Sequence, residues 1–391
     1  MESRNKKLSI GYVERNLKMK KLSLAIIVIF SAMLICGQAY AEMTLKGNVE
    51  INIDYDTSSN NVTTLNTETG VPDDTTTIDT DEKKYDMNGR IKITPNGKTQ
   101  TGNFFFEAQV DILANLDSTV GLEDVWGKIG TDTFDIQIGR FEGIALFDIP
   151  DDIDIVDAPD APKRYEADAA RGRLDNPGQL AVHIIHNDML NVELGTAYGT
   201  LETEVDETPG NDTDEDATHS ENLIGLRPVV LFTFGPIEAA MGMDYQSTSA
   251  QDDEAKYDSN LLGFGGKIKA TFGPASFSIG YTGKTEGGTD FRGHNIKDTA
   301  THSMGGVASV TLGPGRLDGI LFYTISKVDD SDNTQTHNQW YLSYTHPLLV
   351  DNVSIRYSLS GATAGDDLDS DEEGNLDSRA LGFRVQLRFD F

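Results

Sequence analysis

The most conspicuous chemical groups in the chain are the carboxylates of residues 141–175, a stretch that also holds many apolar side chains and three prolines. Proline lacks the backbone N–H that a strand ladder needs, so this stretch is predicted to be a connection between strands. A connection this rich in Phe, Leu, Ile and Val is unusual in contact with water, so we expect it to fold inward. Its apolar side would then lie against a wall, and its carboxylates would face a water-filled channel and concentrate cations there. The candidate pore carboxylates are Asp148, Asp151, Asp152, Asp154, Asp157 and Asp160.

A second set of candidate pore residues is basic, and it lies in alternating segments of the first third of the chain and at its C-terminal end. By the alternation, these side chains point to the same face as the polar residues around them. A basic wall opposite an acidic loop would set an electric field across a constriction and orient dipolar solutes. Alternatively, these bases only solvate the interior and balance inward acids such as Glu50, Asp54, Glu107 and Asp111. The candidate wall bases are Lys46, Arg90, Lys92, Lys128, Arg384 and Arg388.

Other kinds of chemistry find little support in the sequence. The seven histidines are dispersed and form no His-x-x-x-His pattern, and there is no Gly-x-Ser-x-Gly pattern. The single cysteine, Cys36, excludes a disulfide scaffold, and a formal net charge of −31 is the opposite of what a nucleic-acid binder needs. The acidic run at Asp367, Asp369 and Asp371 lacks the glycine of a calcium loop, because Glu372 takes its place. We therefore expect no enzymatic activity, no cofactor and no metal site.

The elements that would position these residues are β-strands. Apolar and polar residues alternate with a period of two in sixteen segments, as in Leu45 to Tyr55, where the odd positions are mostly apolar and the even ones polar. No stretch beyond the N-terminal region reaches the ~20 apolar residues of a transmembrane helix, whereas a barrel strand needs only ~9–11 alternating residues. The predicted strands are 45–55, 85–93, 104–112, 122–130, 133–140, 179–186, 189–199, 222–234, 237–246, 260–272, 275–283, 302–312, 316–327, 338–347, 352–361 and 379–391.

The predicted connections alternate between short and long. Short turns are expected at Thr94 to Gly97, Gly235-Pro236, Gly273-Pro274 and Gly313 to Gly315, and they are separated by long polar segments, the first of which covers residues 56–84. Outer-membrane barrels have tight periplasmic turns and long external loops, whereas a soluble sandwich or propeller has loops of similar length at both ends. The sequence thus predicts an all-β fold: a 16-stranded antiparallel transmembrane barrel with an inward-folded third external loop.

The N-terminal segment has the features of an export signal. Three lysines precede an apolar run from Leu22 to Ile35, and Ala39-Tyr40-Ala41 supplies the small residues that a signal peptidase requires. We therefore divide the chain into an N-terminal extension with a cleaved signal, residues 1–41, and a barrel domain, residues 42–391. The true start of the chain could be Met1 or Met19.

Three segments resemble Gram-negative general porins. They are the start of the predicted first strand, Ala41 to Gly47, the pair Asp124 to Gly130 and Phe134 to Arg140, and the last strand with its alternating apolar residues and terminal Phe391. The resemblance implies a third external loop that forms the constriction, a homotrimer in the cell outer membrane, and contact with lipid and lipopolysaccharide. It also implies that Phe389 and Phe391 are read by the barrel-assembly machinery.

The expected function is a water-filled channel for passive diffusion of small hydrophilic solutes and ions, with a mild preference for cations because acids outnumber bases. A sugar-selective porin would add aromatic residues along the path, for which Phe105, Trp126 and Tyr341 are candidates by alternation. A surface adhesin or structural barrel is the alternative from a different class, and it would use the long acidic loops.

Overall fold

The computed structural model describes residues 41–65, 75–149, 153, 155–172, 178–186, 189–205, 217–251, 256–289, 295–328, 334–350, 352–367 and 376–391. The predicted signal segment, except for Ala41, lies outside these residues. Among the residues described, no helix is long and apolar enough to cross a membrane.

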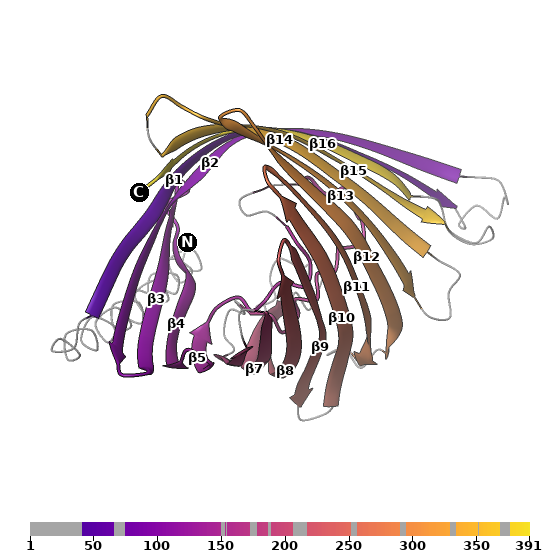
Figure 1. The fold of residues 1–391 in the computed structure, drawn as a ribbon. Helices are drawn as coiled ribbons and strands as arrows, with labels where there is room; N and C mark the ends of the chain where they lie inside the picture. The colour runs from indigo at the N-terminus through magenta and orange to yellow at the C-terminus, as the bar shows by residue number, and fades with distance from the viewer. Residues whose placement is uncertain are drawn as a thin grey trace, which may run out of the picture.

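Sixteen antiparallel strands form one closed barrel, in which each strand pairs with its neighbours in the chain and β1 pairs with β16 (Figure 1). The predicted fold class is therefore confirmed. The strands are β1 (Ala41–Leu65), β2 (Thr75–Thr101), β3 (Phe104–Asn115), β4 (Val120–Thr131), β5 (Phe134–Arg140), β6 (Gly178–His186), β7 (Leu190–Val205), β8 (Ala217–Phe234), β9 (Ile237–Gln251), β10 (Lys256–Phe272), β11 (Ala275–Thr289), β12 (Asn295–Leu312), β13 (Gly315–Val328), β14 (Thr334–Pro347), β15 (Val353–Asp367) and β16 (Leu376–Asp390).

The alternation places apolar residues outside and polar residues inside. In β1, Ile51 and Ile53 are 40% and 59% exposed, whereas the alternate residues Asn52 and Asp54 are buried. A soluble sandwich buries the apolar face of its strands, so this inverted arrangement is that of a barrel surrounded by lipid.

Most of the predicted turns are confirmed, but one is wrong. Short turns occur at Gly235-Pro236, Gly273-Pro274 and Gly313-Pro314. The segment from Thr94 to Gly97, in contrast, lies within β2, and the chain reverses at Gly102, whose φ of 61° suits glycine. The β2–β3 ladder has no pairing at Thr94 and Pro95, which fits a proline without an N–H, while the β1–β2 ladder continues past both.

The strands also extend further than the alternation predicted. Residues 56–65 and 75–84 belong to β1 and β2, although the sequence suggested that they form part of one long polar loop. Both faces of these extensions are polar, so hydrophobic alternation gives no signal there, while the ladder hydrogen bonds continue from Asp56–Lys84 to Leu65–Thr75.

The apolar core lies inside the barrel. It consists of three clusters between the segment that follows β5 and the inner wall, centred on Leu146, Phe147 and Ala158. In Figure 1 this segment, in magenta, runs within the ring of strands. It is called the inner loop below and comprises the described residues of 141–172.

Candidate functional site: the inner loop and the lumen

A buried arginine on β8 joins the two limbs of the inner loop at its root. Arg227 is 1% exposed, and its guanidinium donates to the carbonyl oxygens of Ile144, at 2.6 Å, and Ala167, at 3.0 Å. It also pairs with Glu193 of β7 at 3.3 Å, and that carboxylate accepts the N–H of Ile144. Since the arginine fork donates to several acceptors at once, one side chain fixes the spacing of both limbs.

A buried aspartate on β9 holds the returning limb. Asp244 is fully buried, and it accepts hydrogen bonds from the Tyr165 hydroxyl at 3.0 Å and from the N–H groups of Ala169 and Ala170 at 2.7 and 2.9 Å. Burial, and then the neighbouring Asp244 carboxylate, raises the pKa of the Tyr165 hydroxyl, so it remains a donor. Three donors on one carboxylate compensate for much of its desolvation.

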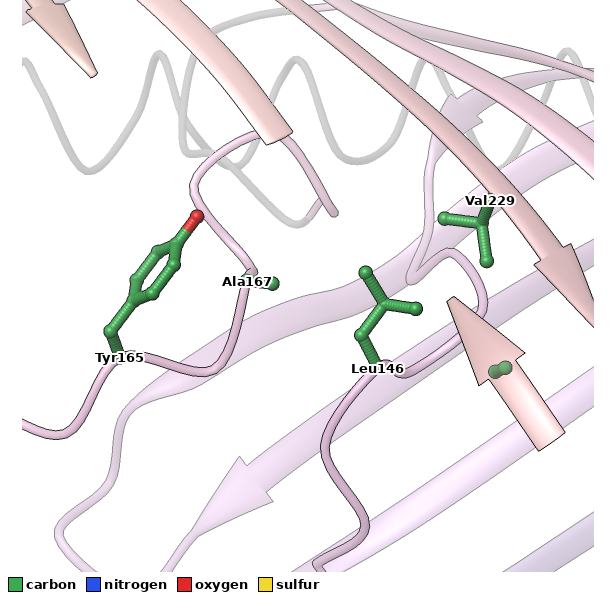
Figure 2. Close-up of a cluster of buried hydrophobic side chains, with 5 residues drawn as sticks. Leu146, Tyr165, Ala167 and Val229 are labelled. Carbon is green, nitrogen blue, oxygen red and sulfur yellow. The ribbon is translucent and has the colours of Figure 1, made fainter. Parts of the chain in front are cut away.

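The apolar side chains of the inner loop pack against the wall. Figure 2 shows Leu146, Tyr165 and Ala167 of the loop beside Val229 of β8, and all four are buried. Further along, Phe147 contacts Phe322 of β13 at a ring distance of 5.3 Å. Such packing explains why the loop carries so many apolar residues, as the sequence predicted.

Glycines on the wall make room for the loop. A Cβ added at Gly263 of β10 would lie 1.7 Å from the Tyr165 hydroxyl oxygen, and one at Gly382 of β16 would lie 2.4 Å from Val156. Any larger residue at either position would displace the loop, because real Cβ contacts of this length do not occur.

The distal part of the loop bonds to strands at the other end of the chain. Asp157 accepts from Gln339 of β14 at 2.6 Å, and the carbonyl of Pro159 accepts from the Ser378 hydroxyl of β16 at 2.7 Å. Asp160 accepts from Asn60 of β1 at 2.8 Å. The inner loop therefore spans the lumen from β7 to β16 and reaches β1.

The predicted pore carboxylates have separate partners. Asp148 lies between the ammonium groups of Lys267 and Lys269 of β10, at 3.4 and 3.3 Å. Partial burial acts to raise the pKa of Asp148, but the two lysines outweigh it and hold the pKa below its usual value. Asp157 and Asp160 bond to the wall as described above. Asp151, Asp152 and Asp154 lie outside the described residues.

Five of the six predicted wall bases line one cavity, and four of these five are paired with acids of the wall itself. Arg384 contacts Asp54 at 2.6 Å, while Arg90 and Arg388 share Glu50, each at 3.1 Å. Lys92 pairs with Asp111 at 2.9 Å and with Glu123 at 2.5 Å. Lys46 also lines the cavity. Lys128 does not line the cavity, and its ammonium group lies 5.3 Å from the centre of the Trp126 ring.

Two cavities flank the inner loop. The larger, about 1370 Å³, lies against β1, β2 and β16, with Glu142 and Ile153 on its loop side. The smaller, about 680 Å³, lies between the loop and the ends of β10 to β16 that carry the short turns. Both are bounded by Ile153, Arg388 and Asp390, so they adjoin. The lumen thus remains open on each side of the loop.

The sequence reading missed the residues that fix the loop and the bases of the smaller cavity. Lys267 and Lys269 stand at inward positions of a correctly predicted strand, so the alternation could have identified them. No local pattern distinguishes Arg227 or Asp244, because their partners in the inner loop lie 60 to 83 residues away in the chain. Other missed residues are Glu193, Arg316 and Arg356.

A buried histidine adds to the wall beneath the loop root without forming a metal site. His183 of β6 bonds through Nδ1 to Asp135 at 2.6 Å and through Nε2 to Glu193 at 3.2 Å. Because the two carboxylates occupy opposite sides of the ring, they do not converge on one point. Within the described part of the chain, no group of three or more His, Cys, Asp or Glu side chains is placed to hold a metal ion.

Comparison with known proteins points to channels of the outer membrane. Residues 45–272 match the model of a family described as porin-like glycoporin RafY. No curated protein sequence matches the chain significantly.

Several solved structures share the fold at low sequence identity. In each comparison 90% of this chain is covered. The trimer form of in-vitro folded OmpT of Vibrio cholerae aligns over 99% of its length, with 12% identity and a TM-score of 0.57. An anion-selective porin from Comamonas acidovorans aligns over 100% of its length, with 16% identity and a TM-score of 0.56. The outer membrane channel DcaP of Acinetobacter baumannii aligns over 97% of its length, with 10% identity and a TM-score of 0.54.

Proposed function

The chain belongs to the porin-like glycoporin family, whose model covers more than half of it, and from this premise we propose that it lets small hydrophilic solutes and ions diffuse passively through its lumen. It is an outer-membrane channel protein rather than an enzyme. We propose which solutes pass through the lumen and how the inner loop limits their size.

The observation that carries the proposal is the inner loop. It is fixed inside the barrel by Arg227, Asp244 and three apolar clusters, yet it leaves charged cavities of about 1370 and 680 Å³ beside it. A structural barrel would have no need for a loop that narrows the lumen without filling it. The loop therefore acts as a constriction that sets the size limit of the channel.

We also propose a mild preference for cations. The carboxylates Glu50, Asp86, Glu123 and Glu142 line the larger cavity together with its bases, and the chain as a whole is strongly acidic. In this proposal Asp148, Asp157 and Asp160 contribute negative charge along the loop, although each also bonds to the wall. Fixed carboxylates in a pore raise the local cation concentration.

Assembly as a homotrimer in lipid and lipopolysaccharide is a further part of the proposal. Its support is the trimer form of the Vibrio cholerae protein, which shares the fold. Phe391 exchanges two backbone hydrogen bonds of 2.9 Å with Gly47 of β1. The C-terminal residue thus takes part in closing the barrel, which agrees with a role for Phe389 and Phe391 in recognition by the assembly machinery.

A sugar-selective channel is the second candidate, and it is favoured by the description of the matching family as a glycoporin. The aromatic path expected for sugars receives no support in the described residues. Tyr341 is buried against Phe147, while Phe105 and Trp126 contact Lys98 and Lys128 and line neither cavity. Any preference for sugars would have to come from hydroxyl and charged groups.

The test is single-channel conductance in a planar bilayer, with protein purified from the outer membranes of an expressing bacterium and with a salt gradient for the reversal potential. We expect stable current steps in groups of three and a reversal potential on the cation side. A folded barrel without current steps would contradict the channel and favour an adhesin or structural role. A reversal potential on the anion side would contradict only the cation preference.

A further inference from the structure

We propose that the smaller cavity is a binding subsite for solutes that carry a carboxylate or phosphate group on a hydroxylated carbon skeleton, such as sugar acids. The inference rests on the proposed channel function and deepens it, because it names a class of solute and the residues that recognise it.

Four bases from four different strands border this cavity on the wall side. Lys269 comes from β10, Arg316 from β13, Arg356 from β15 and Arg388 from β16. Three of them carry guanidinium groups, which bind carboxylate and phosphate oxygens in a bidentate manner. The strand ladders hold these groups in place, so a ligand would meet a preorganised set of donors.

Two of these bases project further into the cavity than the acids that neutralise them. The Arg316 side chain is 54% exposed, whereas its partner Asp318, at 2.7 Å, is 7% exposed. Lys269 is 38% exposed and its partner Asp148 is 20% exposed. The positive groups are therefore more accessible than the carboxylates that orient them, although Asp148 and Asp318 also border the cavity.

Hydroxyl groups surround the bases. Arg316 donates to the Ser309 hydroxyl at 3.0 Å, and Arg356 donates to Thr345 at 3.1 Å. Ser276 and Ser354 complete this lining. Hydroxyls can both donate and accept, so they suit the hydroxyl groups of a solute whose anionic end is held by the guanidinium groups.

The loop side of the cavity limits how much negative charge fits. Glu166 and Asp148 face it from the inner loop together with one base, Arg171, and Asp390 faces it from β16. A solute of low charge with a long hydroxylated portion therefore fits better than a compact, highly charged anion.

The larger cavity has a different character. Its guanidinium groups are shared among Glu50 and Asp54, which are buried between the strands, and Asn48, Asn52 and Asn88 separate them. It therefore offers no comparable cluster of hydroxyls around exposed bases.

The test measures current block by three probes of related skeleton, namely gluconate, glucose and glucosamine, on the full protein purified from outer membranes. We expect half-block by gluconate at a concentration about tenfold lower than for glucose or glucosamine. Arg356→Gln and Arg316→Gln should each raise the gluconate value about tenfold and leave the glucose value unchanged, because they remove a charge-assisted contact. Arg356→Lys should restore part of the effect. Lys128→Gln, which changes a base of β4 that lines neither cavity, should leave gluconate block unchanged.

Three results would overturn the proposal: equal block by gluconate and glucose, gluconate block unaffected by both arginine variants, or an equal effect from Lys128→Gln. Absence of current would instead overturn the proposed function. In that case titration calorimetry with gluconate and glucose decides on the subsite, since binding does not require conduction. Gluconate binding that depends on Arg356 would support it, and its absence would contradict it.

Discussion

The two sides of the inner wall are both polar, but one side binds the inner loop and the other lines the channel. From β7 to β16 the wall presents glycines, hydroxyls and buried ions, and most of these contact the inner loop. Along β1 and β2, and at the β16 end that meets β1, it presents charged side chains that pair across neighbouring strands. The first side exchanges contact with water for contact with the loop, and the second remains a lining of the channel. Buried and paired positions should therefore govern stability on the loop side, and exposed charges should govern selectivity on the open side.

The largest effect is expected from Arg227→Met. The change removes two hydrogen bonds that join the limbs of the loop and leaves the buried Glu193 without its guanidinium partner. Removing one member of a buried ion pair costs about 3–5 kcal/mol. We expect a clearly lower thermal unfolding temperature by circular dichroism and larger, noisier current steps. Lys128→Met on β4, where the contact is with the Trp126 ring, should change both readouts little. Equal effects of the two variants would contradict the comparison.

A smaller effect is expected from Gly263→Val, which fills the space occupied by Tyr165. The added atoms would force the loop away from β10 at a cost of about 1–3 kcal/mol, and the conductance should change with the stability. Gly319→Val is the control, because a Cβ at Gly319 meets no atom within 4 Å. If the Gly263 variant matched the control in denaturant unfolding and conductance, the close packing of the loop would be refuted.

The preference of the channel for cations should depend on pH, and as the pH falls Glu166 should lose its charge before Asp148 does. Burial raises the pKa of Glu166, so its carboxylate takes up a proton first as the pH falls, whereas the pKa of Asp148 is lowered and this group stays charged. Stability linked to Glu166 is fully present at low pH and is lost as pH rises through its raised pKa. As the pH falls from neutral through the raised pKa of Glu166, the reversal potential should therefore become less cation-selective. Glu166→Gln should remove part of this shift, and an unchanged shift would assign it to other groups.

The smallest effect on stability is expected from Arg90→Gln on the open side. Glu50 keeps Arg388 as a partner, and Arg90 is partly exposed to the lumen, so the free energy of unfolding should fall by less than about 1 kcal/mol. The reversal potential should nevertheless move toward cations, because a positive charge leaves the channel lining. A large fall in the free energy of unfolding with no change in the reversal potential would contradict the assignment of stability to the loop side and of selectivity to the open side.

The sequence predicted the strands, the Gly-Pro turns and the inward loop because each depends on a local pattern: alternation, turn residues, or an apolar and acidic connection. It failed at Thr94 to Gly97, where a local turn signal gave way to the β1–β2 ladder. Contacts between the loop and the wall were not predictable. Val156 and Ser360, for example, are 204 residues apart, and only the closed barrel brings them together. The pairing of the predicted bases with Glu50, Asp54 and Asp111 followed the alternative in which bases balance inward acids, because neighbouring strands place these charges side by side.

The central claim is that the inner loop is attached along the wall from β7 to β16, with a single hydrogen bond to Asn60 of β1, and leaves the part of β1 around Asn48 as open lining. The most direct measurement is thiol cross-linking in the native outer membrane, with cysteines introduced at Ala158 of the loop and Ala362 of β15, which share an apolar cluster. The matched control replaces Ala158 and Asn48, a residue of β1 that lines the larger cavity. With a short bifunctional thiol reagent, mass spectrometry should detect the cross-linked peptide for Ala158→Cys/Ala362→Cys and none for Ala158→Cys/Asn48→Cys. Cross-linking of the control pair, or of neither pair, would contradict the account.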